Sequence, residues 1–231
     1  ATDRTANLKL WLRAGDKVEP ETSIARSDFY TDFDGTDDYI DLGTDLTSWF
    51  ESPNKSFSVW IKNSGNTSES RVFNVGYSGS GTGFAFGVDG GTTDNKPFYF
   101  LRDTSAGALK AEFGDVLNTT DWYHFAIAID GTANEAYLYQ NGILKATVSN
   151  VGEPSQGTVD SAKIGKHFNN SDSYYFNGDI SSVGIYQTAL DAQTISQMAK
   201  SRYTPMRDNR FSVVDFDGTN DHIVISDTND L

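Results

Sequence analysis

Most of the chain consists of short segments in which apolar and polar residues alternate. In residues 57–62, for example, Phe57, Val59 and Ile61 fall on one face of an extended strand and Trp60 falls on the other. This period of two predicts half-buried β-strands, and the Gly, Ser, Thr, Asn and Asp clusters between segments predict turns. The pattern therefore favours a sandwich or barrel of many short strands. The alternating segments are 8–12, 39–42, 57–62, 71–77, 84–88, 98–101, 122–129, 135–140 and 143–148.

The dipeptide Asn141-Gly142 is the strongest local turn signal in the chain. It separates two alternating segments, and a type I′ turn needs positive φ at both of its central residues, which Asn and Gly tolerate. We therefore expect a tight β-hairpin at this point.

One segment, residues 190–200, has a helical period instead. Ile195, Met198 and Ala199 recur at helical spacing, and Asp191 is suited to cap the N-terminus of a helix. We therefore expect an all-β fold of two antiparallel sheets with one short helix near its C-terminal end. The apolar residues expected between the sheets are Trp11, Phe57, Val59, Ile61, Phe73, Phe84, Phe86, Ile127, Ile129, Leu138, Ile164, Ile180 and Ile185.

The charge of the chain excludes some partners. It carries 32 acidic and 18 basic side chains among 231 residues, for a formal net charge of -14. Such a surface repels a phosphate backbone, so nucleic acid is not an expected partner. No apolar run reaches the roughly 18 residues of a membrane span. Because there is no cysteine, disulfides and thiolate metal sites are excluded.

An internal repeat organises the chain. The stretch Asp32–Ile40 (DFDGTDDYI) recurs as Asp215–Ile223 (DFDGTNDHI). Long-period repeats are typical of domain arrays. We therefore expect one domain over residues 1–203, a linker over 204–210 and the opening strands of a second copy over 211–231. Either the chain continues into that second domain, or the segment adds as a strand to a neighbouring surface.

Three stretches resemble a known family. Residues 33–40 look like the opening motif of laminin-G-like domains, residues 122–142 resemble their central hairpin, and residues 176–191 are similar to their closing strand and helix. The resemblance implies a concanavalin-A-like jelly roll, whose loops or concave face bind sugars in many members. In many relatives an Asp that helps to hold a structural calcium stands where this chain has Ser181. That departure argues against the family's usual calcium site.

The carboxylates do not predict an enzyme. Glycosidases need two carboxyl groups a few ångströms apart, one as acid and the other as nucleophile or base. The chain has Glu19-Pro-Glu21 in a polar loop beside a proline, and its other glutamates stand alone in the sequence. The three histidines lack a Ser and Asp context for nucleophilic catalysis. The isolated glutamates are Glu51, Glu69, Glu112, Glu135 and Glu153.

Residues 32–38 gather four aspartates around Gly35. Asp34, Asp37 and Asp38 could offer carboxylate oxygens to calcium, a hard cation with oxygen ligands. The alternative is a turn in which the aspartates accept hydrogen bonds from local backbone N–H groups and Gly35 takes a positive φ. Calcium is thus the one cofactor that the sequence suggests.

Residues 167–175 form a polar loop that is rich in aromatic rings. Exposed rings offer flat apolar faces to sugars, and Asn side chains can bond to hydroxyl groups. The alternative is that the rings pack on the rim of the sandwich. The candidate glycan-binding residues are His167, Phe168, Asn169, Asn170, Tyr174 and Tyr175.

These observations favour a non-catalytic carbohydrate-binding or adhesion module of a larger, multimeric surface assembly. Its partners would be a glycan or cell-surface polysaccharide and other surface proteins. The repeats and the connector 203–211 look like those of laminin-G-like virion proteins of tailed bacteriophages, which implies a virion or extracellular location. The alternatives are a purely structural virion subunit without a glycan site and a secreted bacterial polysaccharide-binding module.

Overall fold

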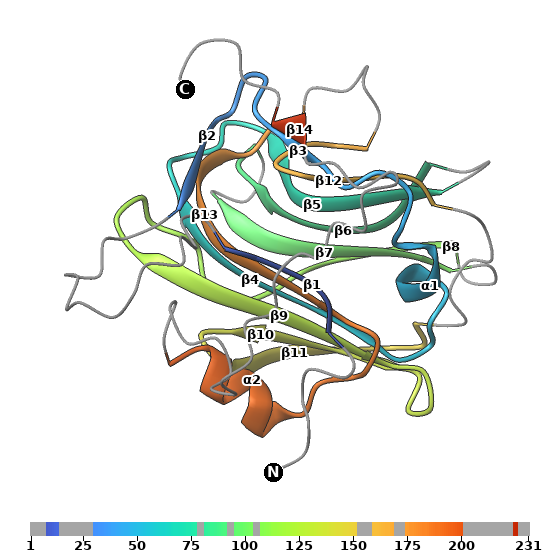
Figure 1. Cartoon of the computed structure of the whole chain (residues 1–231). Helices are drawn as coiled ribbons and strands as arrows, with labels where there is room; N and C mark the ends of the chain where they lie inside the picture. The colour runs from blue at the N-terminus through green and yellow to red at the C-terminus, as the bar shows by residue number, and fades with distance from the viewer. Residues whose placement is uncertain are drawn as a thin grey trace, which may run out of the picture.

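The computed structural model describes residues 8–13, 30–77, 81–91, 95–103, 107–151, 159–168, 174–200 and 224–225. These residues form two antiparallel sheets that face each other around a shared apolar core (Figure 1). In the part of the chain that the structure describes, no helix is long and apolar enough to cross a membrane. The expected all-β jelly-roll sandwich is confirmed.

The first sheet, sheet A, has seven strands. Every adjacent pair is antiparallel, and the strands belong to distant parts of the sequence. In spatial order they are β1 (Leu8–Arg13), β13 (Asn177–Tyr186), β4 (Lys55–Asn63), β9 (Trp122–Asp130), β10 (Glu135–Gln140) and β11 (Ile143–Ser149), while β2 (Thr31–Asp34) also pairs with β13.

The second sheet, sheet B, also has seven strands, all antiparallel. One of its edges is formed by segments from opposite ends of the sequence. In spatial order the strands are β14 (Val224–Ile225), β3 (Ile40–Asp41), β12 (Val159–Ile164), β5 (Glu69–Tyr77), β6 (Gly81–Asp89), β7 (Lys96–Asp103) and β8 (Gly107–Glu112).

The core is formed by the apolar residues that the alternating sequence pattern predicts. Of the residues expected between the sheets, those with described side chains are at most 5% exposed, and only the side chain of Trp11 lies outside the described residues. Phe57 of sheet A stacks on Phe73 of sheet B, with ring centroids 4.7 Å apart. Burial of many such rings from both sheets is the main stabilising term of the fold.

The predicted hairpin and the predicted helix are both confirmed. Asn141 and Gly142 have φ of 53° and 76° and join β10 to β11. Helix α2 (Ala192–Met198) begins after Asp191, whose side chain accepts a hydrogen bond of 2.6 Å from the backbone N–H of Thr194. This N-cap satisfies one of the free donors at the start of the helix.

The expectation of a single helix is wrong. A second helix, α1 (Thr47–Phe50), precedes β4 and buries Trp49 and Phe50. The Trp49 indole N–H donates to the Tyr186 carbonyl oxygen at 3.0 Å, which ties α1 to sheet A. A single helical turn is too short for a helical period to show in the sequence. It is stabilised by tertiary contacts rather than by a local pattern.

The predicted domain division remains a prediction. The linker 204–210 and the repeat 211–231, apart from β14, lie outside the described residues.

Candidate functional site

The candidate site lies on the outer face of sheet B, the face turned away from the core. Phe73 and Val75 of β5 pack into the core, whereas Arg71 and Asn74 of the same strand do not belong to it. On β7, Phe98 likewise lies opposite Gly87 and outside the core cluster. Described residues between β12 and β13, among them Phe168 and Tyr174, contact β5 on this outer face.

Gly165 directly follows β12. It has a φ of +84°, and a Cβ at this position would lie 2.4 Å from the ring of Phe33. Its N–H donates to the Val72 carbonyl oxygen at 2.9 Å, and its carbonyl oxygen accepts from Phe176 N–H at 2.9 Å. Only glycine fits this backbone conformation at such a close approach, so the turn out of β12 depends on it.

Phe168 sits directly on the backbone of β5. A Cβ on Gly76 would lie 2.2 Å from the Phe168 ring, so glycine makes the seat for that ring. The Phe168 N–H donates to the Asn74 side-chain oxygen at 2.8 Å, and the Asn74 amide donates to the Phe84 carbonyl oxygen at 3.1 Å. Asn74 is fully buried, so both bonds hold the loop in one position.

Tyr174 covers Arg71. Its ring centroid is 5.0 Å from the guanidinium carbon, and its carbonyl oxygen accepts from Arg71 N–H at 3.0 Å. His167 packs between rings, 4.5 Å from Phe168 and 5.4 Å from Tyr174. Tyr174 is 38% exposed whereas Arg71 is 7% exposed, so a solvent-facing ring rests on a buried cation.

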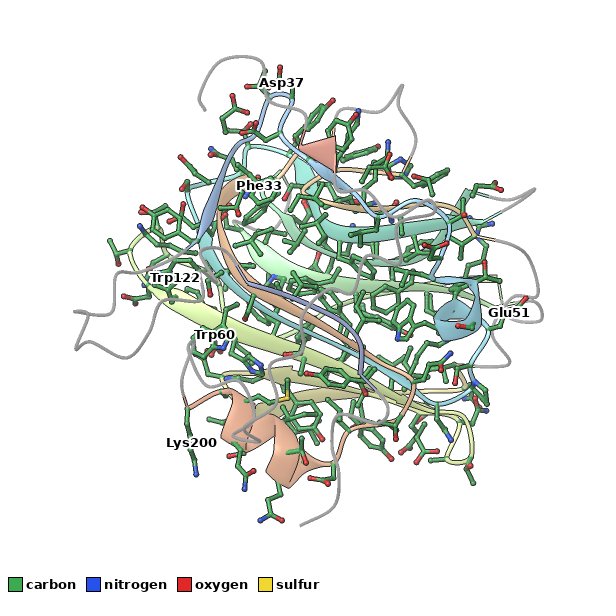
Figure 2. All side chains as sticks on the ribbon, in the orientation of Figure 1. Phe33, Asp37, Glu51, Trp60, Trp122 and Lys200 are labelled. Carbon is green, nitrogen blue, oxygen red and sulfur yellow. The ribbon has the colours of Figure 1, made fainter. Side chains whose placement is uncertain are left out.

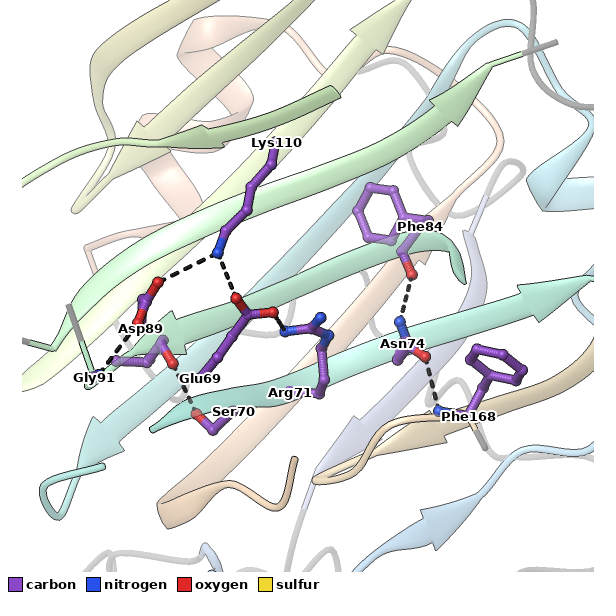
Figure 3. A network of polar contacts seen from close by, with 10 residues as sticks. Glu69, Ser70, Arg71, Asn74, Phe84, Asp89, Gly91, Lys110 and Phe168 are labelled. Atoms are coloured by element: carbon purple, nitrogen blue, oxygen red, sulfur yellow. Dashed lines mark hydrogen bonds and ion pairs between the residues drawn. The ribbon is translucent and has the colours of Figure 1, made fainter. Parts of the chain in front are cut away.

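A four-residue charge network supports that cation (Figure 3). Glu69 forms ion pairs with Arg71 and with Lys110, and Lys110 also reaches Asp89 at 3.3 Å. Arg71 and Lys110 both lie over the ring of Phe98, at 4.8 and 4.6 Å. The network thus alternates cations and carboxylates across β5, β6 and β8.

The charges in this network stabilise one another. Burial alone would raise the pKa of Glu69, but hydrogen bonds and ion pairs with Lys110 and Arg71 outweigh it and leave the pKa below its ordinary value. For Lys110, the two carboxylates likewise outweigh burial and raise the pKa. Both groups therefore stay charged near neutral pH. Arg71 Nε is buried and has no hydrogen-bond partner among the described residues.

A second cationic group lies beside the same loop. The Lys166 ammonium is 4.7 Å from the ring centroid of Tyr175 and 5.0 Å from that of Tyr39. The Lys163 ammonium also lies over the ring of Tyr39, 4.8 Å from its centroid. Cation–π contacts of this kind hold rings in fixed orientations at the surface.

The structure brings together most of the predicted glycan-binding residues, in different environments. Tyr174 is exposed, Phe168 and Tyr175 are half-buried, and His167 is buried. Asn169 and Asn170 lie outside the described residues. Their role in binding a glycan stays a prediction. The sequence reasoning missed Arg71, Lys110 and Phe98, although Gly76 and Gly87 within strands signal a close approach of something to the backbone.

The sequence interpretation of Glu69 as an isolated carboxylate is wrong for the folded chain, where a second carboxylate lies on the neighbouring strand. The register places Glu69 of β5 directly opposite Asp89 of β6, and Lys110 bridges them. An acid catalyst needs a raised pKa, whereas that of Glu69 is lowered. Glu69 therefore does not have the raised pKa of a glycosidase's general acid.

The acidic turn between β2 and β3 forms as a compact structure, with Asp37 at its tip (Figure 2). The Asp34 carboxylate accepts from Thr36 N–H at 2.6 Å, and Asp38 accepts from Asp34 N–H at 2.9 Å. Gly35 has a φ of +78°. These are the contacts of the hydrogen-bonded turn that the sequence also allowed.

The same turn brings carboxylates together. Oxygens of Asp34, Asp37 and Asp38 lie within 4.8 Å of one another, with two of these residues exposed and one half-buried. With one ligand oxygen each, three carboxylates supply at most half of the six to eight oxygen ligands that calcium takes. Calcium binding at this turn remains a prediction.

Comparison with known families matches the described fold. Residues 34–196 match the family model of the concanavalin A-like lectin/glucanases superfamily. No curated protein sequence matches the chain significantly.

Solved structures share the architecture at low sequence identity. The CBM40 of a Ruminococcus gnavus IT-sialidase, bound to α2,3-sialyllactose, is 15% identical with a TM-score of 0.63, covering 74% of this chain and 96% of that chain. A heptameric SAP-like pentraxin from Limulus polyphemus is 18% identical with a TM-score of 0.62, covering 85% and 91%. A NanB sialidase variant from Streptococcus pneumoniae is 15% identical with a TM-score of 0.59, covering 72% of this chain and 27% of that chain.

Proposed function

Since the chain belongs to the concanavalin A-like lectin/glucanase superfamily, we propose that it is a non-catalytic glycan-binding module. The proposal places the ligand on the outer face of sheet B, around Tyr174. The observation that carries it is an exposed tyrosine ring held from behind by the buried guanidinium of Arg71. Such a ring is a rigid, flat apolar surface of the kind that sugar rings stack on.

The support behind the ring is fixed before any ligand arrives. Glu69 pairs with Arg71, and both Arg71 and Lys110 lie over the ring of Phe98. A binding group that is already held in place loses little conformational entropy on binding, which favours affinity.

Two further points support a binding module rather than an enzyme. The carboxylate pair Glu69 and Asp89 is bridged by Lys110, and the pKa of Glu69 is lowered. The Ruminococcus gnavus CBM40, a carbohydrate-binding module of the same fold, is bound to sialyllactose. At 15% identity this likeness supports a glycan as ligand and does not name the sugar.

The wider setting of the module is also a proposal. Its place would be in a multimeric surface assembly, and the likeness of the repeat and of the connector 203–211 to tailed-bacteriophage proteins supports a virion. A purely structural subunit is the second candidate, favoured by the pairing of β14 with β3. Glycan binding distinguishes the two.

The test is a glycan array probed with the 231-residue chain, followed by calorimetric titration of the best ligand. Replacing Tyr174 and Tyr175 together by Ala should weaken binding at least about tenfold, the usual effect of removing a central aromatic anchor. Tyr30→Ala is the matched control, because Tyr30 is a 46% exposed tyrosine whose ring lies 5.8 Å from that of Trp122, away from residues 167–175.

Three results would count against the proposal. The array could show no glycan binding, which would leave the structural subunit. The double variant could bind as tightly as the parent chain, which would remove the loop from the site. Release of reducing ends from a bound polysaccharide would make the protein an enzyme.

A further inference from the structure

The open edge of sheet B is extended by a strand from the repeated part of the sequence. β14 lies beside β3 (Figure 1) and pairs with it in antiparallel orientation, with Val224 opposite Asp41 and Ile225 opposite Ile40. The other side of β3 is bonded to β12. β14 is therefore the outermost strand of this edge among the residues that the structure describes.

β14 overlaps the counterpart of β3 in the repeat, offset by one residue. The stretch that ends at Ile40 recurs in the stretch that ends at Ile223. One position further along, Val224 corresponds to Asp41. The strand that covers β3 thus comes from the same place in the second copy as β3 does in the first.

The register of this pair is two-fold symmetric. Val224 lies opposite Asp41, which is its own counterpart in the repeat. When two equivalent antiparallel strands pair with one residue facing its counterpart, a two-fold axis passes between those residues. That is the geometry of an isologous interface, in which the same surface is used on both sides.

The backbone of β3 is oriented for this contact. Leu42 N–H donates to the Ala162 carbonyl oxygen at 2.8 Å, on the β12 side. Because backbone groups of successive residues point to opposite sides of a strand, the N–H and C=O of Asp41 point toward β14. An uncovered edge would leave these groups open to pairing with any other strand.

The side chains select the repeated copy over a second β3. If two β3 strands paired in this register, Asp41 would lie opposite another Asp41, and like charges directly opposite are destabilising. The repeat has Val224 at that position, which removes the repulsion. The one substitution at the axis therefore disfavours pairing of two β3 strands and permits pairing with the repeated copy.

We propose that β3 is a copy-recognition edge, which pairs about a two-fold axis with the equivalent strand of the repeated copy in the same chain. Sheet B would then continue from one copy of the domain into the next. The proposal does not depend on glycan binding.

Disulfide cross-linking tests the register directly, because the chain has no cysteine. The variant D41C/V224C places two cysteines directly opposite, within the Cα separation that a disulfide needs. Under mild oxidation it should form an intramolecular disulfide nearly completely. In the control D41C/I225C the second cysteine points to the other face of the strand, so the reaction should be at least about tenfold slower.

Amide hydrogen exchange tests the charge argument without cysteines. The Asp41 amide should be protected in the parent chain and lose at least about tenfold of its protection in Val224→Asp. Adding Asp41→Asn should restore it, because Asn keeps an acceptor for Gly43 N–H, which Asp41 binds at 2.9 Å, and removes one charge. Thermal melting of each variant checks that the domain is folded.

The outcomes are distinct. Equal cross-linking of the two cysteine pairs, or no protection of the Asp41 amide in the parent chain, would overturn the pairing. Disulfide-linked dimers instead of intramolecular links would overturn the assignment to the same chain. A Val224→Asp variant with full protection would overturn the role of charge.

Discussion

The two outer faces of the sandwich are covered in different ways. On sheet A, α2 packs Ile195 against Ala126, Ala128 and Tyr139, which makes an apolar seal (Figure 1). On sheet B, the segment after β12 covers the strands with aromatic rings that rest on charged side chains. One face is closed by a helix, and the other presents a tyrosine to solvent.

The polar groups on the two outer faces also differ. His124, on the same face of β9 as Ala126 and Ala128, is fully buried, and its Nδ1 has no hydrogen-bond partner in the described part of the chain. Burial lowers its pKa to about 3, so it is neutral at ordinary pH. On the outer face of sheet B, Glu69 and Lys110 remain charged and paired. The difference suggests that the helix-covered face serves stability and the loop-covered face serves binding.

The largest expected effect is a loss of stability on the helix-covered face without a loss of binding. Ile195→Ala removes a fully buried side chain between α2 and sheet A. It should lower the free energy of unfolding by about 2–5 kcal/mol, as is usual for such truncations, and leave glycan affinity unchanged in the folded fraction. Urea unfolding and calorimetric titration measure the two quantities. Weaker binding by a folded Ile195→Ala variant would break the division of roles.

The next effect is the acid sensitivity of the helix-covered face. The folded-state pKa of His124 is about 3, below the ordinary 6.5 of the unfolded chain. The unfolded state therefore binds more protons between these values, and stability falls as pH falls through that window. His124→Gln should remove this acid-induced loss of unfolding free energy, which is on the order of a few kcal/mol. Unfolding curves at pH 7 and pH 4 provide the test, and an equal drop in both proteins would refute it.

The smallest effect on stability is expected on the loop-covered face. Glu69→Gln removes the carboxylate that pairs with the buried guanidinium of Arg71 and with Lys110. It should cost about 1–2 kcal/mol, because Gln keeps an oxygen that can accept from Arg71 but loses the attraction between the charges. It should still weaken glycan binding, since Arg71 loses its fixed partner.

Asp115→Asn is the matched control for that variant. It removes the same charge from another surface ion pair, with Lys145 at 2.7 Å, away from the candidate site. It should leave glycan affinity as it is. If the two variants weakened binding equally, net charge rather than the position of Arg71 would be the cause.

The sequence predicted the framework of the sandwich well because its elements have local signatures. Alternation marks a half-buried strand, Asn141-Gly142 fits only a few turns, and Asp191 precedes a helical period. These signals act within a few residues, so distant contacts do not override them. The single turn of α1 lacked such signatures, and so did the strand β12, in which half of the residues are polar and do not alternate regularly.

The candidate site was predicted only in part for a related reason. The aromatic loop was visible because its rings are clustered in sequence. The cation behind Tyr174 was not visible in the sequence. Arg71 and Glu69 come from β5 and Lys110 comes from β8, and only the pairing register of sheet B brings these side chains together. Residue spacing alone does not reveal such cross-strand neighbours.

The central claim is that ligand binds the loop-covered face of sheet B and not the helix-covered face of sheet A. The most direct measurement is the change in backbone amide NMR shifts when the glycan selected on the array is added to the isotope-labelled chain. We expect the largest changes at Arg71, Phe168, Tyr174 and their neighbours, and none at Ala126 or Ile195. Changes that cluster around α2, with the amides of the loop-covered face unmoved, would contradict the account.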